Sequence, residues 1–135
     1  MAVGGWILDK SAAALSGDEP IAAQLDELAG ALYLCPVAQL EQLYSTRSAR
    51  HYDDLAQELR ASFQLVTAPA DVFDTALHLQ RDLARHHGMW HRTPLPDLLI
   101  ATTALHHGLG VVHVDAHFDR IAEVRPLVVR RLRAG

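Results

Sequence analysis

Short apolar runs alternate along the chain with longer segments whose apolar residues recur every three or four positions. The short runs predict strands, since turn residues bound them, and the longer segments predict amphipathic helices. The strands expected are residues 6–8, 31–34, 63–66, 110–114 and 127–129. The helices expected are residues 11–15, 18–30, 36–44, 52–61, 69–87, 94–108 and 118–124, with a loop over 88–93.

This alternation is typical of an α/β fold. Helix-length connections between strands favour parallel pairing, and the run Val111-Val112 suits a strand that is buried on both faces. We therefore expect a mainly parallel sheet of four to five strands. Right-handed crossovers would bring the carboxyl ends of these strands to one edge, where open α/β sheets bind ligands.

Composition narrows the class of protein. The chain has 135 residues, half of them apolar, so we expect residues 1–135 to form one domain with its own core. The net charge of −4 gives no global basic footprint, so any contact with nucleic acid must come from a local patch. The one cysteine, Cys35, excludes an internal disulfide, and we predict that it packs in the core. No apolar stretch approaches the roughly 20 residues that span a bilayer, and we expect a cytoplasmic protein.

Two acidic residues follow strand-like runs. Asp9 ends the run Gly-Trp-Ile-Leu, and Asp115 ends the run Val-Val-His-Val. Burying an isolated carboxylate is costly unless a cation or hydrogen-bond donors compensate the charge. Their positions predict that both acids lie on the ligand-binding edge of the sheet.

Two more acidic residues lie in apolar helices. Glu41 is one helical turn from Val37 and from Tyr44, which places it beside apolar residues on the inward face. Asp97 lies in the first turn of an almost wholly apolar helix. Taken singly, Asp97 is equally well explained as a cap near the positive end of the helix dipole, and Glu41 as the partner of a nearby arginine.

The set of four acids favours a metal site. Carboxylates that converge on one rim repel one another unless a divalent cation holds them. An all-oxygen ligand set selects Mg²⁺, with Mn²⁺ as a substitute. Two such ions would activate a water and stabilise the leaving oxygen in phosphodiester cleavage, whereas one ion would do part of that work.

Four motifs then carry a resemblance to a family. They are Ile-Leu-Asp-Lys-Ser-Ala at 7–12, Cys-Pro-Val-x-x-x-Glu-x-x-Tyr-Ser at 35–45, Pro-x-Pro-Asp-Leu-Leu-Ile-Ala at 94–101, and Val-Asp-x-x-Phe-Asp-x-Ile-Ala at 114–122. In this order and at this spacing they resemble PIN-domain ribonucleases, and more narrowly the VapC toxins of type II toxin-antitoxin modules. The resemblance covers nearly the whole chain.

The resemblance implies a three-layer α/β/α sandwich, an Mg²⁺-dependent endoribonuclease, a VapB-type antitoxin partner and a homodimer. Operator DNA would be contacted only through the antitoxin. It also implies that Asp9, Glu41, Asp97 and Asp115 form the acidic quartet, with Asp9 and Asp97 as the direct metal ligands. Ser11 would help to order the site.

One position departs from the family pattern. Many relatives carry an Asp or Asn two residues after the last acid, where this chain has His117. A neutral imidazole there would hydrogen-bond a metal-bound water or a phosphate, whereas a protonated one would repel a cation. We interpret His117 instead as a tolerated peripheral substitution.

RNA contacts are predicted from the region before Asp97. Arg81, Arg85 and Arg92 would hold phosphates, although such contacts carry no information about base sequence. Trp90 would stack an unpaired base, or would cover the core or a dimer interface.

Other metal and enzyme hypotheses fit less well. Zinc bound by the paired histidines is disfavoured, because neighbouring side chains on a helix point apart and no His-Glu-x-x-His motif occurs. His113 is predicted to be packed or hydrogen-bonded within its strand. A phosphatase with Asp9 as nucleophile lacks the usual second acid two residues later. From a different class, the alternative to the nuclease is a catalytically weak PIN-like module that acts by binding its antitoxin and, as a complex, operator DNA.

Overall fold

The computed structural model describes residues 3–14, 16–114 and 116–133, with the side chains of residues 87–89 left out. The elements in chain order are β1 (Trp6–Leu8), α1 (Lys10–Ala13), α2 (Glu19–Asp26), β2 (Leu32–Leu34), α3 (Pro36–Tyr44), α4 (Ala49–Ser62), β3 (Gln64–Leu65), α5 (Val72–His87), the 3₁₀ helix η1 (Gly88–Arg92), α6 (Leu95–His107), β4 (Gly110–His113), α7 (His117–Ala122) and β5 (Val129–Arg131).

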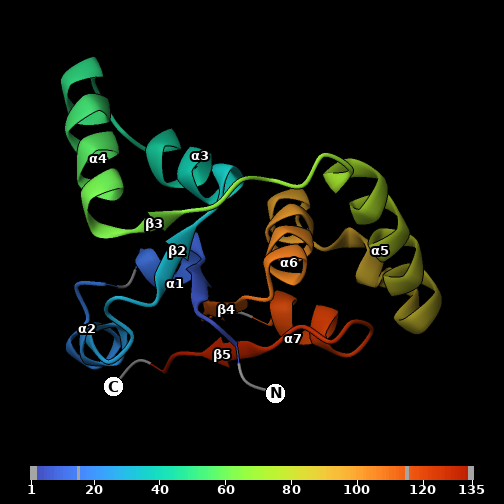
Figure 1. Ribbon diagram of the computed structural model, residues 1–135. Helices are drawn as coiled ribbons and strands as arrows, with labels where there is room; N and C mark the ends of the chain where they lie inside the picture. The colour runs from blue at the N-terminus through green and yellow to red at the C-terminus, as the bar shows by residue number, and fades with distance from the viewer. Residues whose placement is uncertain (1–2, 15, 115, 134–135) are drawn as a thin grey trace.

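The sheet has five strands in the order β3-β2-β1-β4-β5, and every pairing is parallel. In Figure 1, α3 and α4 lie at the upper left, α6 and α5 lie toward the right, α2 lies at the lower left, and α7 lies beside β4 and β5. The predicted α/β/α architecture with a parallel sheet is therefore confirmed. Its strand number is at the upper end of the expected range.

The strand order reverses between β1 and β4. From β1 the chain builds outward through β2 to β3, and from β4 it builds outward on the other side to β5. Leu8 pairs with Val112 at this junction, and Asp9 donates its backbone N–H to the Val112 carbonyl at 3.0 Å. In open α/β sheets such a reversal leaves a crevice at the carboxyl ends of the strands, so the fold itself sets a ligand site beside Asp9.

Several boundaries differ from the predicted ones, and α2 for example ends at Asp26 rather than at residue 30. Residues 88–92 form a 3₁₀ helix rather than a loop. Helix α4 begins at Ala49 because the Ser48 side chain accepts a hydrogen bond from the His51 N–H and caps the helix. The last strand is 129–131 rather than 127–129, since Leu127 forms a turn with Arg125 before the chain pairs with β4.

The core lies on both sides of the central strands. Every residue of β4 is buried, and α6 buries most of its length, as its nearly continuous apolar sequence requires. Phe118 and Ile121 of α7 are completely buried as well, which fixes α7 against the rest of the fold. Cys35 is fully buried, as predicted.

The ends of β1 and β4 opposite the crevice pack tightly. A Cβ added at Gly110 would lie 2.5 Å from the Trp6 ring and 2.8 Å from the Val128 carbonyl oxygen, so this position requires glycine. In the part of the chain that the structure describes, no helix is both long and apolar enough to cross a membrane.

Candidate metal centre

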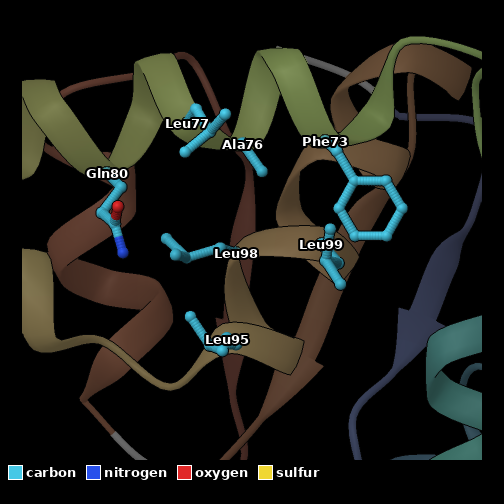
Figure 2. Close-up of a pocket in the computed structure, with 7 residues that line it drawn as sticks. All are labelled: Phe73, Ala76, Leu77, Gln80, Leu95, Leu98 and Leu99. Carbon is cyan, nitrogen blue, oxygen red and sulfur yellow. The ribbon is translucent and has the colours of Figure 1, made fainter.

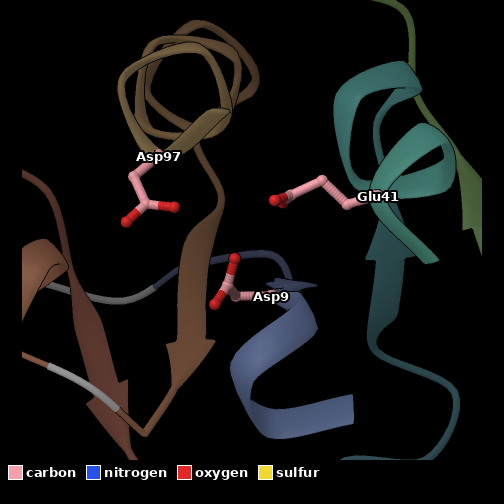
Figure 3. A group of neighbouring side chains, drawn as sticks. All are labelled: Asp9, Glu41 and Asp97. Carbon is pink, nitrogen blue, oxygen red and sulfur yellow. The ribbon is translucent and has the colours of Figure 1, made fainter. Parts of the chain in front are cut away.

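Three of the four predicted acids come together above the carboxyl ends of the central strands. Asp9 lies at the start of α1, Glu41 extends from α3 and Asp97 projects from the first turn of α6, so that their carboxylates face one another (Figure 3). One oxygen from each lies within 4.8 Å of the others. Asp115, the fourth predicted acid, lies outside the described residues.

Asp9 is held by the turn that follows β1. It caps α1, and its Oδ2 accepts a hydrogen bond from the Ser11 N–H at 3.0 Å. The Ser11 hydroxyl oxygen in turn accepts a hydrogen bond from the Val114 N–H at 3.2 Å. Ser11 therefore fixes the Asp9 carboxylate and also ties α1 to the chain just after β4. Because Asp9 is only 3% exposed, it is buried in the way that its position predicts.

The environment of Glu41 disfavours the charged form of its carboxyl. Its Oε1 is buried and has no hydrogen-bond partner among the described residues. Burial raises the pKa of this carboxyl, the negative charge of Asp9 raises it further, and Lys10 lowers it. Glu41 does point inward as predicted, but Tyr44 does not share that direction, since the Tyr44 side chain is 88% exposed.

Asp97 is buried in the first turn of α6 and contacts the start of α7. Its Oδ2 lies 3.0 Å from Nδ1 of His117, whose side chain is about one third exposed. His117 is therefore not peripheral in position, because its imidazole lies at the edge of the acidic site against the Asp97 carboxylate. That the substitution is tolerated stays a prediction.

The three carboxylates fit a hard divalent cation. They offer oxygen ligands alone, they are mostly shielded from water, and one buried oxygen of Glu41 lacks a donor. Within the described ranges, this is the one group of three or more His, Cys, Asp or Glu side chains with metal-ligand spacing.

His113, by contrast, is a fully buried packing residue, as predicted: the centre of its ring lies 5.4 Å from the centre of the Phe118 ring. Its Nε2 is 3.4 Å from Asp119 Oδ1, without the alignment of a hydrogen bond.

The predicted RNA-binding residues lie on α5 and η1. Arg81 and Arg85 are exposed on α5, and Arg81 is 3.7 Å from Asp82. Arg92 is exposed at the end of η1. Their exposure is compatible with phosphate binding, which stays a prediction for all three arginines.

Trp90 is partly buried against the core rather than freely exposed. The Arg120 guanidinium lies 5.6 Å from the centre of its ring, and the His86 ring contacts it as well. Of the roles predicted for Trp90, covering the core is the one that this arrangement bears out.

Two residues at the mouth of the site were missed from the sequence. Lys10 follows Asp9 directly, and Tyr44 is one turn after Glu41; both line a pocket that reaches Glu41. The sequence could have indicated Lys10 as a site residue, because Lys10 is adjacent to Asp9. It could not have indicated the exposure of Tyr44, because helical spacing placed Tyr44 on the inward face.

The parallel sheet, the reversal in strand order and the carboxylate cluster are the features by which the chain can be compared with known protein families. The model of the PIN domain family matches residues 7–124, and the chain belongs to this family. Within the family it is related to the VapC proteins. It is 54% identical over 124 residues to Ribonuclease VapC17 of Mycobacterium tuberculosis, covering 90% of each chain. It is also 34% identical over 121 residues to Ribonuclease VapC21 of the same organism, covering 88% of this chain and 87% of the relative.

Solved structures share the fold at lower identity. The DNA-bound VapBC structure from Salmonella typhimurium matches with a TM-score of 0.75 and 16% identity, covering 94% of this chain and 97% of that one. VapBC2 from Rickettsia felis, bound to a DNA fragment from its promoter, matches with a TM-score of 0.73 and 18% identity, covering 95% of this chain and 98% of that one.

Proposed function

We propose that the protein is an Mg²⁺-dependent endoribonuclease that acts as the toxin of a toxin-antitoxin module, with residues 1–135 working as one PIN domain. The observation that carries this proposal is the cluster of Asp9, Glu41 and Asp97, whose oxygens lie within 4.8 Å of one another at the switch point of the sheet. The VapC relatives, which are named ribonucleases, supply the substrate class.

The chain's own residues would divide the work as follows. Asp9 and Asp97 would bind Mg²⁺ directly, or Mn²⁺ in its place, and Glu41 and Asp115 would complete the ring. The ion, when bound, lowers the pKa of a coordinated water and neutralises charge on the phosphate. Ser11 holds the Asp9 carboxylate through its backbone N–H, and His117 holds that of Asp97. Because both contacts are present without substrate, the carboxylates would already be oriented when substrate binds.

The test is RNA cleavage by the purified protein with Mg²⁺, with Mn²⁺, and with EDTA. We expect cleavage with either metal and none with EDTA, with activity restored by excess Mg²⁺. The sequence of the new RNA ends after induced expression would then identify the target. Cleavage that persists in EDTA at the same rate would contradict the metal mechanism.

The antitoxin contact is proposed for a groove whose wall includes sequence neighbours of two of the acids. A cavity of about 490 Å³ lies between α1, α2 and α4, and Leu8 and Gln42 in its wall adjoin Asp9 and Glu41 in the sequence. Asp26 and Glu58 also line it, so it suits an apolar segment that carries basic side chains. A basic side chain of such a segment would neutralise the carboxylates in place of the metal. Co-expression with a VapB-type protein from the same operon, where one is present, should give a stable complex and restore growth; failure of both results would refute this partner.

The homodimer is proposed to use the exposed apolar face of α5 and α6. Phe73 and Leu77 on α5 and Leu95 on α6 are each more than 60% exposed, and they border a cavity of about 250 Å³ whose polar lining is Gln80 alone (Figure 2). Exposed apolar patches of this kind mark protein contacts.

Replacement of Leu77 by Asp should shift the protein from dimer to monomer in light scattering, because it would bury a charge in the contact. Tyr52→Asp is the matched control, since Tyr52 is an exposed apolar residue on α4. An unchanged mass for Leu77→Asp would rule out this face.

A further inference from the structure

A second cavity opens beside the metal centre and is separate from the antitoxin groove. It has a volume of about 430 Å³ and is called here the Tyr44 pocket. The lining residues used in the argument are Lys10, Leu40, Glu41, Tyr44, Leu95 and Pro96. A volume of this size is within the range of pockets that bind small organic groups.

The Tyr44 pocket is continuous with the acidic cluster. Glu41 belongs to both, Lys10 follows Asp9 in the chain, and Pro96 precedes Asp97. A group in this pocket would therefore lie next to whatever the three carboxylates hold. If that is the scissile phosphate, the neighbouring group is an adjacent nucleotide of the same strand.

The walls of the pocket suit the flat face of a base. The Tyr44 side chain is 88% exposed, and Leu40 and Leu95 are 66% and 65% exposed. Tyr44 thus presents a ring, whereas the Trp90 ring is already contacted by Arg120 and His86. Exposed aromatic rings stack on unpaired bases and do so with little dependence on base identity.

The charge of the pocket suits a phosphate at its rim. Lys10 and Glu41 are its two ionisable lining groups apart from the Tyr44 phenol, and Lys10 is exposed. Lys10 is also the one lysine of the chain. Its charge lies at the edge of the acidic cluster, because Lys10 follows Asp9 directly and lines the pocket together with Glu41. An anionic substrate that approaches this edge of the cluster would meet the positive charge of Lys10.

We propose that the Tyr44 pocket binds one unpaired nucleotide of the RNA substrate beside the bond that is cut, with its base against Tyr44 and Leu40 and its phosphate on Lys10. This assignment rests on the proposed ribonuclease function and names its substrate as single-stranded at that nucleotide. It also moves the principal RNA contact from the arginines of α5 to the mouth of the metal centre.

The base contact is tested with Tyr44→Ala. The probe is a fluorescein-labelled single-stranded RNA oligonucleotide of mixed sequence, bound to proteins that also carry Asp9→Asn so that the RNA stays intact. We expect binding to weaken roughly 5- to 100-fold, the loss seen when one stacking aromatic is removed. Tyr44→Phe should bind as the parent does, and Tyr52→Ala on α4 is the matched surface control. In otherwise wild-type protein, KM should rise with little change in kcat.

The phosphate contact is tested with Lys10→Ala in the same assay. Loss of one phosphate contact should reduce the slope of log affinity against log salt by about 0.7, the value for single strands. Lys10→Arg should restore the slope, and Arg60→Ala removes an exposed cation of α4 as a control. A probe that carries 4-thiouridine should also crosslink to Tyr44.

The outcomes separate this proposal from the function on which it rests. If wild-type protein cleaves RNA while Tyr44→Ala and Lys10→Ala bind the probe as the parent does, the pocket assignment is overturned and the ribonuclease stands. If Tyr44→Ala instead lowers the mass in light scattering and leaves RNA affinity unchanged, the surface is a contact between copies of the chain, and the assignment is again overturned. If wild-type protein neither binds nor cleaves RNA with Mg²⁺, both proposals fail.

Discussion

Asp9→Asn should lower the rate of Mg²⁺-dependent RNA cleavage by roughly 10³-fold, because a direct metal ligand supports several kcal/mol of charge stabilisation in the transition state. The substitution keeps the size of the side chain. The amide oxygen of Asn also accepts the hydrogen bond from the Ser11 N–H, so the turn after β1 should be preserved. The loss should therefore appear in kcat while the protein stays folded.

A second aspartate of the chain gives the matched control. Asp18 caps α2 and accepts a hydrogen bond from the Ile21 N–H at 3.2 Å, as Asp9 does for α1. Asp18→Asn removes the same charge from a comparable cap outside the acidic cluster, and it should leave the cleavage rate unchanged. Single-turnover rates measured for both variants would decide the matter, and a rate for Asp9→Asn within tenfold of wild type would remove Asp9 from the ligand set.

The position of Asp9 was predictable because it depends on local pattern. A short apolar run that ends in an acid places that acid at the end of a strand, and helix-length connections make the strands parallel. Asp97 followed from similar reasoning, since two prolines fix where its helix begins. Glu41 needed only the helical period. Each of these predictions used residues within one or two turns of the acid.

The contact of His117 and the choice among the roles of Trp90 could not be predicted in this way, because the surroundings of both residues come from distant parts of the chain. His117 meets Asp97 across the gap between α6 and α7, and Arg120 reaches the Trp90 ring from α7. The last strand was misplaced for a related reason: its position is set by pairing with β4 rather than by its own apolar residues. Contacts between elements decide such details, and no periodicity within a single element encodes them.

Replacement of Glu41 should have a large effect on the stability of the metal-free protein, and the direction of the pKa shift of Glu41 gives its sign. Burial and the Asp9 charge raise the pKa of Glu41 above its ordinary value of 4.5, so the folded, metal-free protein favours the protonated carboxyl. Protonation of Glu41 therefore stabilises the folded state. This stabilisation is fully present below pH 4.5, the ordinary pKa, and is lost as the pH rises through the raised pKa of the folded protein. At neutral pH the ionised cluster therefore destabilises the fold, and Glu41→Gln should raise the Tm of the protein in EDTA.

Another carboxylate has the opposite pH dependence and must be separated from Glu41. The hydrogen bond from Arg125, at 2.6 Å, lowers the pKa of Asp82, so its contribution is present at neutral pH and is lost as the pH falls through that lowered pKa. The total change of Tm with pH mixes both effects. The difference between wild type and Glu41→Gln cancels Asp82, which both proteins retain, and should grow from acidic to neutral pH.

Mg²⁺ should reverse the order of the two proteins. Wild type should be stabilised by about 2.7 kcal/mol when the ion is a hundredfold above its dissociation constant, because the ion binds the folded cluster and not the unfolded chain. Glu41→Gln has one carboxylate fewer and should gain less at the same concentration. Thermal melts of both proteins, in EDTA and along an Mg²⁺ titration at neutral pH, measure this reversal. If Mg²⁺ raised both melting temperatures equally, Glu41 would not take part in holding the ion. The raised pKa of its carboxyl would then be a consequence of burial in the fold and not a sign of a metal ligand.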